Sequence, residues 1–170
     1  MRIQAPASLL CFCFLNVLIG FWGDCLYGQN TFQKRFGSHY EDNATKVIQT
    51  QDGNLLIAGI TFGFGSAGNA MLCKVSSTGD LMWIKDYPGI NRDKIYDVIE
   101  LPNGDLVMCG ASDSYGNPWA SAFAMKTDDE GNMIWGHVFG DSAGYVLHQI
   151  LPDGAGGYYT LGYGGSYFLP

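Results

Sequence analysis

The sequence predicts an all-β protein built from repeated units of four short antiparallel strands, and three observations lead to this prediction. The chain of 170 residues is rich in glycine, with 24 residues, and in aromatic side chains, which make up 14%. Charged residues make up only 15%, against about 25% in an average soluble domain. Turn and strand landmarks recur about every 51 residues, and no segment has a sustained helical periodicity.

The repeat is defined first by its turns. An Asp-Gly or Asn-Gly pair precedes an apolar run that ends in glycine, and this layout occurs in residues 51–59, 102–110 and 152–162. The run-ending glycines, spaced by 51 and 52 residues, are Gly59, Gly110 and Gly162. An Asp-Gly or Asn-Gly pair supplies the positive φ angles of a tight hairpin turn. Each copy therefore predicts a β-hairpin.

A second landmark recurs in "TGDLMWIKDYPG" and "EGNMIWGHVFGD". In both, a glycine is followed four residues later by tryptophan and four residues further by another aromatic residue: Gly79, Trp83, Tyr87 and Gly131, Trp135, Phe139. The two tryptophans are 52 residues apart, in agreement with the turns. A glycine turn that starts a strand, with an aromatic residue packed on the neighbouring unit, accounts for this spacing. We therefore interpret Trp83 as a packing residue.

The first unit is predicted at residues 40–89. Its strands are expected at residues 44–50, 55–61, 70–75 and 81–87. The second of these, "LLIAGIT", is apolar throughout, as expected of a strand buried on both faces. Two tight turns and one longer loop connect the four strands.

The second unit, residues 94–141, repeats this order, with strands expected at residues 96–101, 105–112, 120–126 and 133–139. Residues 142–170 form a partial third unit, and residues 31–37 form an orphan outer strand, in which Phe32 lies 51 residues before Trp83. Four strands in about 40 to 50 residues are typical of a β-propeller blade.

Propellers have typically four to eight blades, and blades bury their faces only against neighbours. The fold class predicted is therefore an incomplete β-propeller, of about two and a half blades plus an N-terminal strand. We expect the N-terminal part of a longer protein, with remaining blades elsewhere or self-association through open blade faces.

The N-terminal segment predicts export. Arg2 precedes an apolar run from Leu9 to Trp22, which is short for a spanning helix of about 20 residues and fits a secretory signal. Residues 1–28 are interpreted as a signal peptide, with a retained membrane anchor as the alternative. The protein is then secreted or at the cell surface, and it meets the membrane only through this signal.

The cysteines allow two interpretations. Three of the five lie in the signal segment, and Cys73 and Cys109 lie in apolar strands. Export permits a disulfide between these two. Because they occupy different positions within their repeats, two buried free thiols are favoured.

A family resemblance supports this organisation. The segments "DNATKVIQTQDGNLLIAGIT", "KVSSTGDLMWIKDYPG", "YDVIELPNGDLVMCGAS" and "KTDDEGNMIWGHVFG" resemble the exported propeller-repeat proteins common in Bacteroidota. The resemblance runs from about Thr31 to the end of the chain. It implies a propeller fold and export, and it implies no particular activity.

Two motifs resemble known propeller sites. "TGDLMW", residues 78–83, is similar to the Thr-Gly-x-x-x-Trp docking motif of quinone-dependent propellers, but Glu130 replaces the threonine in the second copy. Thr127, Asp129 and Gly131 are similar to a sialidase-type Asp-box, which is a structural turn, and Trp135 comes one residue late. Packing and turn formation account for both, and no cofactor is predicted.

Metal and acid-base chemistry are not supported by spacing. Residues 128–130 are three adjacent acids, which do not point in one direction as a calcium site requires, so a solvated turn is favoured. His39, His137 and His148 show no ligand-pair spacing, and His137 is expected to be exposed. No catalytic, cofactor-binding or metal residue is assigned.

The function predicted is that of a non-enzymatic scaffold or binding module for a protein or glycan. The net charge of −7 and the lack of a basic cluster exclude nucleic acid. The binding surface is expected on the loops 61–68 and 112–119, where Phe62, Phe64, Tyr115 and Trp119 either stack on sugar or pack internally. The alternative is part of a propeller enzyme, a quinone-dependent oxidoreductase or a glycan-active enzyme, with catalytic residues mostly outside this chain.

Overall fold

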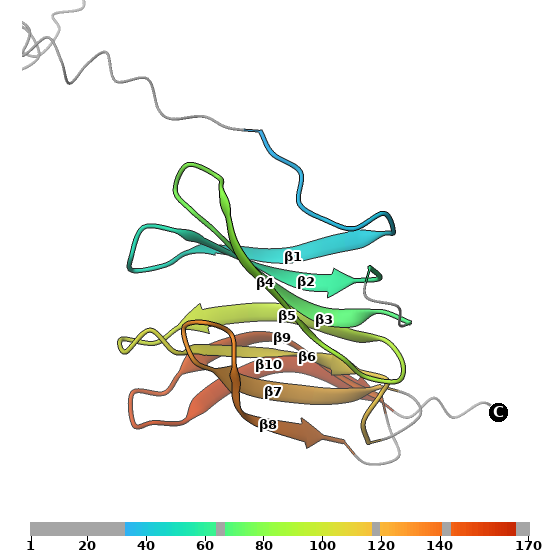
Figure 1. Ribbon diagram of the computed structural model, residues 1–170. Helices are drawn as coiled ribbons and strands as arrows, with labels where there is room; N and C mark the ends of the chain where they lie inside the picture. Colours follow the sequence, from blue (N-terminus) through green and yellow to red (C-terminus); the bar gives the residue numbers. More distant parts are fainter. Residues whose placement is uncertain (1–32, 64–66, 117–119, 141–143, 166–170) are drawn as a thin grey trace, which may run out of the picture. The chain divides into compact units, whose positions relative to one another are not determined.

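The structure is a computed structural model that describes residues 33–63, 67–116, 120–140 and 144–165 (Figure 1). The predicted signal peptide, residues 1–28, lies outside these ranges. The described residues form strands, turns and irregular segments without a helix. In the part of the chain described here, no helix is therefore long and apolar enough to cross a membrane. The compact unit considered below runs from Lys34 to Pro170.

Within the described residues, ten strands form three antiparallel sheets (Figure 1). Sheet A has the order β1 (Asp42–Gln49), β2 (Leu55–Thr61), β3 (Asn69–Val75) and β4 (Leu81–Tyr87). Sheet B has the order β5 (Asp93–Glu100), β6 (Leu106–Ser112), β7 (Ser121–Thr127) and β8 (Met133–Phe139). Sheet C pairs β9 (Gly144–Pro152) with β10 (Tyr158–Gly165). The prediction of an all-β protein with four-stranded antiparallel sheets is confirmed.

Three strands coincide with their predicted ranges: β2, β4 and β8. The first strands of sheets A and B begin two to three residues earlier than predicted, at Asp42 and Asp93. A β-bulge in each strand, at Thr45 and Tyr96, explains the difference. A bulge shifts the alternation of side chains by one residue, so the residues before it leave the pattern that predicts the strand.

The predicted outer strand at residues 31–37 is not seen in its described part. Residues 33–37 are irregular and form no strand. A strand is defined by its ladder partner, and no described strand pairs with this segment. The outer strand therefore stays a prediction, and its first two residues lie outside the described ranges.

The core lies between the sheets. Leu56, Ala58, Ala70 and Leu72 of sheet A pack with residues of sheet B in one cluster, with Trp83 and Tyr87 at its side. Their partners are Ile95, Val98, Leu106, Met108, Phe123 and Met125. A second cluster joins Val107 and Cys109 of sheet B to Ile150 of sheet C. Cys73 and Cys109 are both buried and free, which confirms the favoured interpretation of the cysteines.

The structure explains why each apolar run ends in glycine. Gly59, Gly110 and Gly162 each lie beside the bulge of the neighbouring first strand. A Cβ atom would lie 2.1, 2.0 and 2.1 Å from the carbonyl oxygens of Asn43, Lys94 and Val146, respectively. Any larger residue would collide with backbone that cannot move cheaply. The repeated glycine is thus required by close approach of two strands.

Candidate functional site

The bulges place one residue of each first strand at an equivalent position. The bulged residues are Thr45 in β1, Tyr96 in β5 and His148 in β9. A bulge turns the extra side chain away from the regular alternation of the strand. The hydroxyl of Thr45 donates a hydrogen bond of 2.6 Å to the carbonyl oxygen of Ile95, which links sheet A to sheet B. The other two bulged residues are aromatic and contact each other.

Three aromatic rings and one lysine ammonium lie in a row at these bulges, with members from sheets B and C. The ring centroids of Tyr96 and His148 are 4.5 Å apart, and those of His148 and Tyr163 are 5.4 Å apart. The ammonium of Lys94 lies 5.1 Å from the centroid of Tyr96. We call these four residues the bulge row. Burial, with a smaller effect of Tyr163, raises the pKa of the Tyr96 hydroxyl, so this hydroxyl remains a donor at neutral pH.

The predicted binding loops lie close to the bulge row. Phe62 lies in the loop after β2. The guanidinium carbon of Arg92 lies over its ring, 5.8 Å from the ring centroid. The charges of Arg92 and of Asp113, in the loop after β6, both act on Tyr96. Tyr115 is 53% exposed and donates a hydrogen bond of 3.0 Å to the carbonyl oxygen of Pro88. Phe62 and Tyr115 thus have internal contacts, while the other two loop aromatics, Phe64 and Trp119, lie outside the described residues.

Beside these loops, a buried carboxylate fixes the start of β5. Asp93 accepts hydrogen bonds from the hydroxyls of Ser112 and Ser114. Asp42 takes the same position in β1 and accepts from the backbone N–H of Ser38 at 2.5 Å. These two aspartates were not identified from the sequence. Their spacing of 51 residues was the signal that could have found them.

Asp97 connects three first strands and was also missed. Its side chain is buried in β5, and Oδ1 lies 2.8 Å from Nζ of Lys46 in β1. Its Oδ2 accepts a hydrogen bond of 3.0 Å from the backbone N–H of Ile150 in β9. One carboxylate therefore contacts β1 and β9 at once. Because both of its oxygens have partners within the fold, Asp97 has a structural position.

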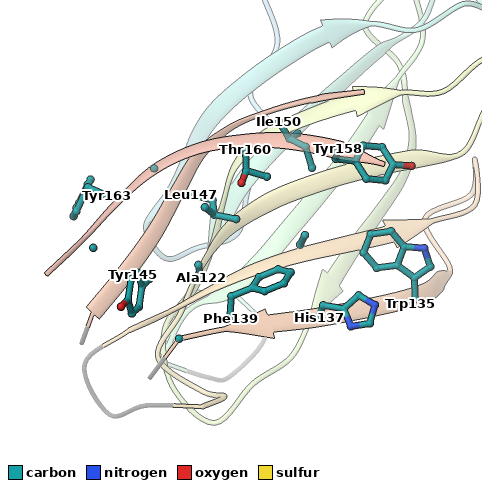
Figure 2. A pocket seen from close by; sticks show the side chains of 14 residues that line it. Ala122, Trp135, His137, Phe139, Tyr145, Leu147, Ile150, Tyr158, Thr160 and Tyr163 are labelled. Carbon is teal, nitrogen blue, oxygen red and sulfur yellow. The ribbon is translucent and has the colours of Figure 1, made fainter. Parts of the chain in front are cut away.

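A groove of about 790 Å³ lies between the β7–β8 side of sheet B and sheet C (Figure 2). Trp135, His137 and Phe139 form an aromatic row along β8, with centroid distances of 5.2 and 6.4 Å between neighbours. The ring of Tyr158 on β10 lies 6.4 Å from Trp135. The floor includes Ala122 and Ala124 of β7. The groove is apolar and aromatic, and its wall on the side of sheet C has two strands.

The predicted motif residues have structural roles. Trp83 packs against the core, which confirms its interpretation as a packing residue. Thr78 donates a hydrogen bond of 2.9 Å to Asp80 within its own turn. The carboxylate of Asp128 accepts from the backbone N–H groups of Glu130 and Asn132, at 3.0 and 2.7 Å, and so closes the acidic turn.

The three histidines lie in different surroundings. His137 is exposed on β8, as predicted. His148 is held by its ring contacts in the bulge row, and His39 is exposed in the irregular segment before β1. Among the described residues, no three His, Cys, Asp or Glu side chains are grouped so that they could hold a metal ion.

Comparisons with known proteins give no assignment. No family model matches the chain, and a search of curated proteins finds no match.

Proposed function

We propose that the protein is an exported, non-enzymatic scaffold or binding module of the β-propeller type, and that its ligand surface is the bulge row with the adjoining loops. The observation that carries this proposal is the contact of Tyr96, from sheet B, with His148, from sheet C, at equivalent bulges. Two sheets thereby contribute to one surface. Binding surfaces of repeat proteins are commonly assembled in this way, from the same position of successive units.

The chemistry of the row favours an anionic glycan. The ring faces of Tyr96 and His148 are occupied by neighbours, so a ligand meets their polar edges together with the ammonium of Lys94. Arg92 lies nearby and acts electrostatically on Tyr96. Cations and protonated donors suit a carboxylate or sulfate group. Tyr163 is 63% exposed, and the face of its ring turned away from His148 offers apolar area for a sugar face.

Binding to an array of neutral and anionic oligosaccharides tests this proposal. We expect the full chain to retain anionic oligosaccharides, and Lys94→Gln and His148→Gln to reduce retention at least tenfold. The matched control is Tyr159→Leu, because Tyr159 is on β10, is 68% exposed and is not part of the row. Retention of no oligosaccharide, or equal retention by all variants, contradicts the proposed ligand.

The export part of the proposal depends on residues 1–28 and is tested separately. A reporter enzyme that is active only outside the cytoplasm is fused behind this segment. We expect activity, together with cleavage near Gly28, and loss of both when two charged residues interrupt the run from Leu9 to Trp22. A reporter that stays inactive contradicts export.

A further inference from the structure

We infer that the groove between sheets B and C docks a β-hairpin of the same repeat type as β7 and β8, which pairs with the free edge of β10 and places its glycine turn on Trp135. This inference concerns the groove, which shares Tyr163 with the bulge row, and it does not depend on the proposed ligand. It is carried by a comparison of two interfaces within the molecule. In the interface between sheets A and B, a strand and a turn cover the aromatic face. We infer the same elements for the groove between sheets B and C.

The better covered interface joins sheets A and B, and it keeps an apolar pocket of about 400 Å³ beside Ala70, Tyr87 and Phe123. Phe123 and Met125 of β7 lie in the same core cluster as Ala70 and Leu72 of β3. The turn between β7 and β8 lies on Trp83: a Cβ added to Gly131 would come within 3.3 Å of the Trp83 ring.

Two hydrogen bonds fix this turn. The hydroxyl of Tyr87 donates to the carbonyl oxygen of Gly131 at 2.9 Å, and Nζ of Lys85 donates to the side chain of Asn132 at 3.0 Å. A strand and a glycine turn together therefore cover this face of sheet A.

The face of sheet B that borders sheet C carries the same kinds of residue as the face of sheet A that borders sheet B. Ala122, Ala124, Trp135 and Phe139 are the repeat equivalents of Ala70, Leu72, Trp83 and Tyr87. Sheet C supplies Ile150 and Tyr158, the equivalents of Val98 and Leu106.

The equivalents of Phe123 and Met125 are missing from the described residues, and the groove lies at their place (Figure 2). Phe139 is accordingly 51% exposed, whereas Tyr87 is partly buried. The groove therefore has, in its lining, the repeat equivalents of the residues that β7 and the β7–β8 turn cover on sheet A.

The edge of β10 is available for this strand. Among the described residues β10 pairs with β9 alone, whereas its equivalents β2 and β6 each pair on both sides. The occupant pairs antiparallel to β10, as β7 pairs with β6. Backbone hydrogen bonds to an open edge supply affinity, and side-chain pockets supply selectivity. Here the selective contacts are the two aromatic side chains Trp135 and Phe139.

A second copy of this chain does not fit as the occupant. Antiparallel pairing of two β10 strands places a twofold axis perpendicular to the joint sheet. Sheet B packs on one face of sheet C, and this axis brings sheet B of the other copy to the same face, so the two copies of sheet B compete for the space beside β10. The occupant is therefore a hairpin that has no sheet of its own packed on that face.

A synthetic peptide of residues 121–139 tests the inference on the full chain labelled with ¹⁵N. We expect saturable binding, slower amide exchange along β10 and shifted resonances of Trp135 and His137. Phe139→Glu in the chain is expected to weaken binding at least tenfold. Met82→Glu is the matched control and is expected to have no effect, because Met82 is 51% exposed on β4, outside the groove. A peptide with Glu at positions 123 and 125 is expected not to bind.

A fused chain tests the same inference if the free peptide does not fold. Residues 112–140 are placed directly after Tyr163, which continues the repeat because Tyr163 is equivalent to Ala111. With phenylalanine in place of the two tryptophans of the added segment, we expect a larger urea m-value and a shift of tryptophan emission to shorter wavelength, because Trp135 of the original chain becomes buried. An unchanged m-value and emission overturn the inference. So does a dimer of the unmodified chain whose β10 amides are already protected without peptide.

Discussion

The phenol of Tyr87 on β4 donates a hydrogen bond of 2.9 Å to the backbone carbonyl oxygen of Gly131, in the turn between β7 and β8. This bond joins sheet A to sheet B at a point far from either first strand. It shows that the glycine of the repeated Gly-x-x-x-Trp pattern has two roles. It forms its own turn with a φ of 79°, and it lets that turn lie against Trp83 of the preceding sheet.

Removal of the Tyr87 hydroxyl is expected to weaken the contact between sheets A and B. Burial raises the pKa of Tyr87, so its hydroxyl stays protonated and donates at neutral pH. Tyr87→Phe leaves the buried Gly131 carbonyl without this donor, which costs about 1 to 2 kcal/mol of unfolding free energy. Urea unfolding followed by circular dichroism measures the loss. Tyr159→Phe, an exposed control, is expected to change nothing, and equal stability of both variants would contradict this role.

The run-ending glycines are expected to tolerate no side chain. In Gly110→Ala the new Cβ meets the carbonyl oxygen of Lys94 at 2.0 Å. Overpacking of this kind costs about 1 to 3 kcal/mol. Gly165→Ala is the control, because a Cβ there has no neighbour within 4 Å. Thermal unfolding of the two variants compares them directly, and a Gly110→Ala protein as stable as Gly165→Ala would show that the strands can separate at little cost.

Asp97 is expected to hold β1, β5 and β9 together through its charge. Asp97→Asn keeps the shape of the side chain but leaves Lys46 without its partner and weakens the bond from the Ile150 N–H. Because Lys46 is partly exposed, a loss of about 1 to 3 kcal/mol is expected. A double-mutant cycle with Lys46→Met measures the coupling. Strictly additive effects of the two substitutions would show that the ion pair contributes nothing.

The two core thiols are expected to react only after unfolding. Burial raises the pKa of Cys73 to about 11 and that of Cys109 to about 12, so neither is a thiolate at neutral pH. Mass spectrometry after iodoacetamide treatment at pH 8 should find both unmodified in the native protein and both modified in urea. Rapid labelling of Cys109 in the native protein would mean that sheets B and C separate readily.

Stability is expected to fall in acid partly because of Asp52. A hydrogen bond from the Thr50 hydroxyl, followed by the ammonium of Lys74 at 2.9 Å, lowers the pKa of this carboxyl. Since its folded pKa lies below the unfolded value of about 4, its contribution is present above about pH 4 and is lost as the pH falls through the folded pKa. Asp52→Asn should flatten the acid side of the stability curve measured by urea unfolding. Lys74→Gln should flatten it less, and an unchanged curve in both would contradict the assignment.

Local sequence was sufficient for most of the strands. The Asp-Gly turn at Asp52 and the apolar run after it fix β2 to the residue, because turn chemistry and burial agree there. The starts of β1 and β5 were misplaced because a bulge disturbs the alternation. The bulge row was not predicted, since nothing in the surroundings of Tyr96 or His148 in the sequence shows that their rings meet. Contacts between residues 52 positions apart depend on how two sheets pack.

The sequence by itself determined the repeat, its turns and the packing role of Trp83. These are properties of each unit, set by backbone propensity and by the burial of alternate side chains. Only the tertiary structure decided which units share a surface: that Asp97 contacts both β1 and β9, that Gly110 must admit the backbone of β5, and that the β8 aromatic row borders a groove. The physical reason is that such contacts depend on the distance and angle between sheets, which arise when their buried faces close on each other.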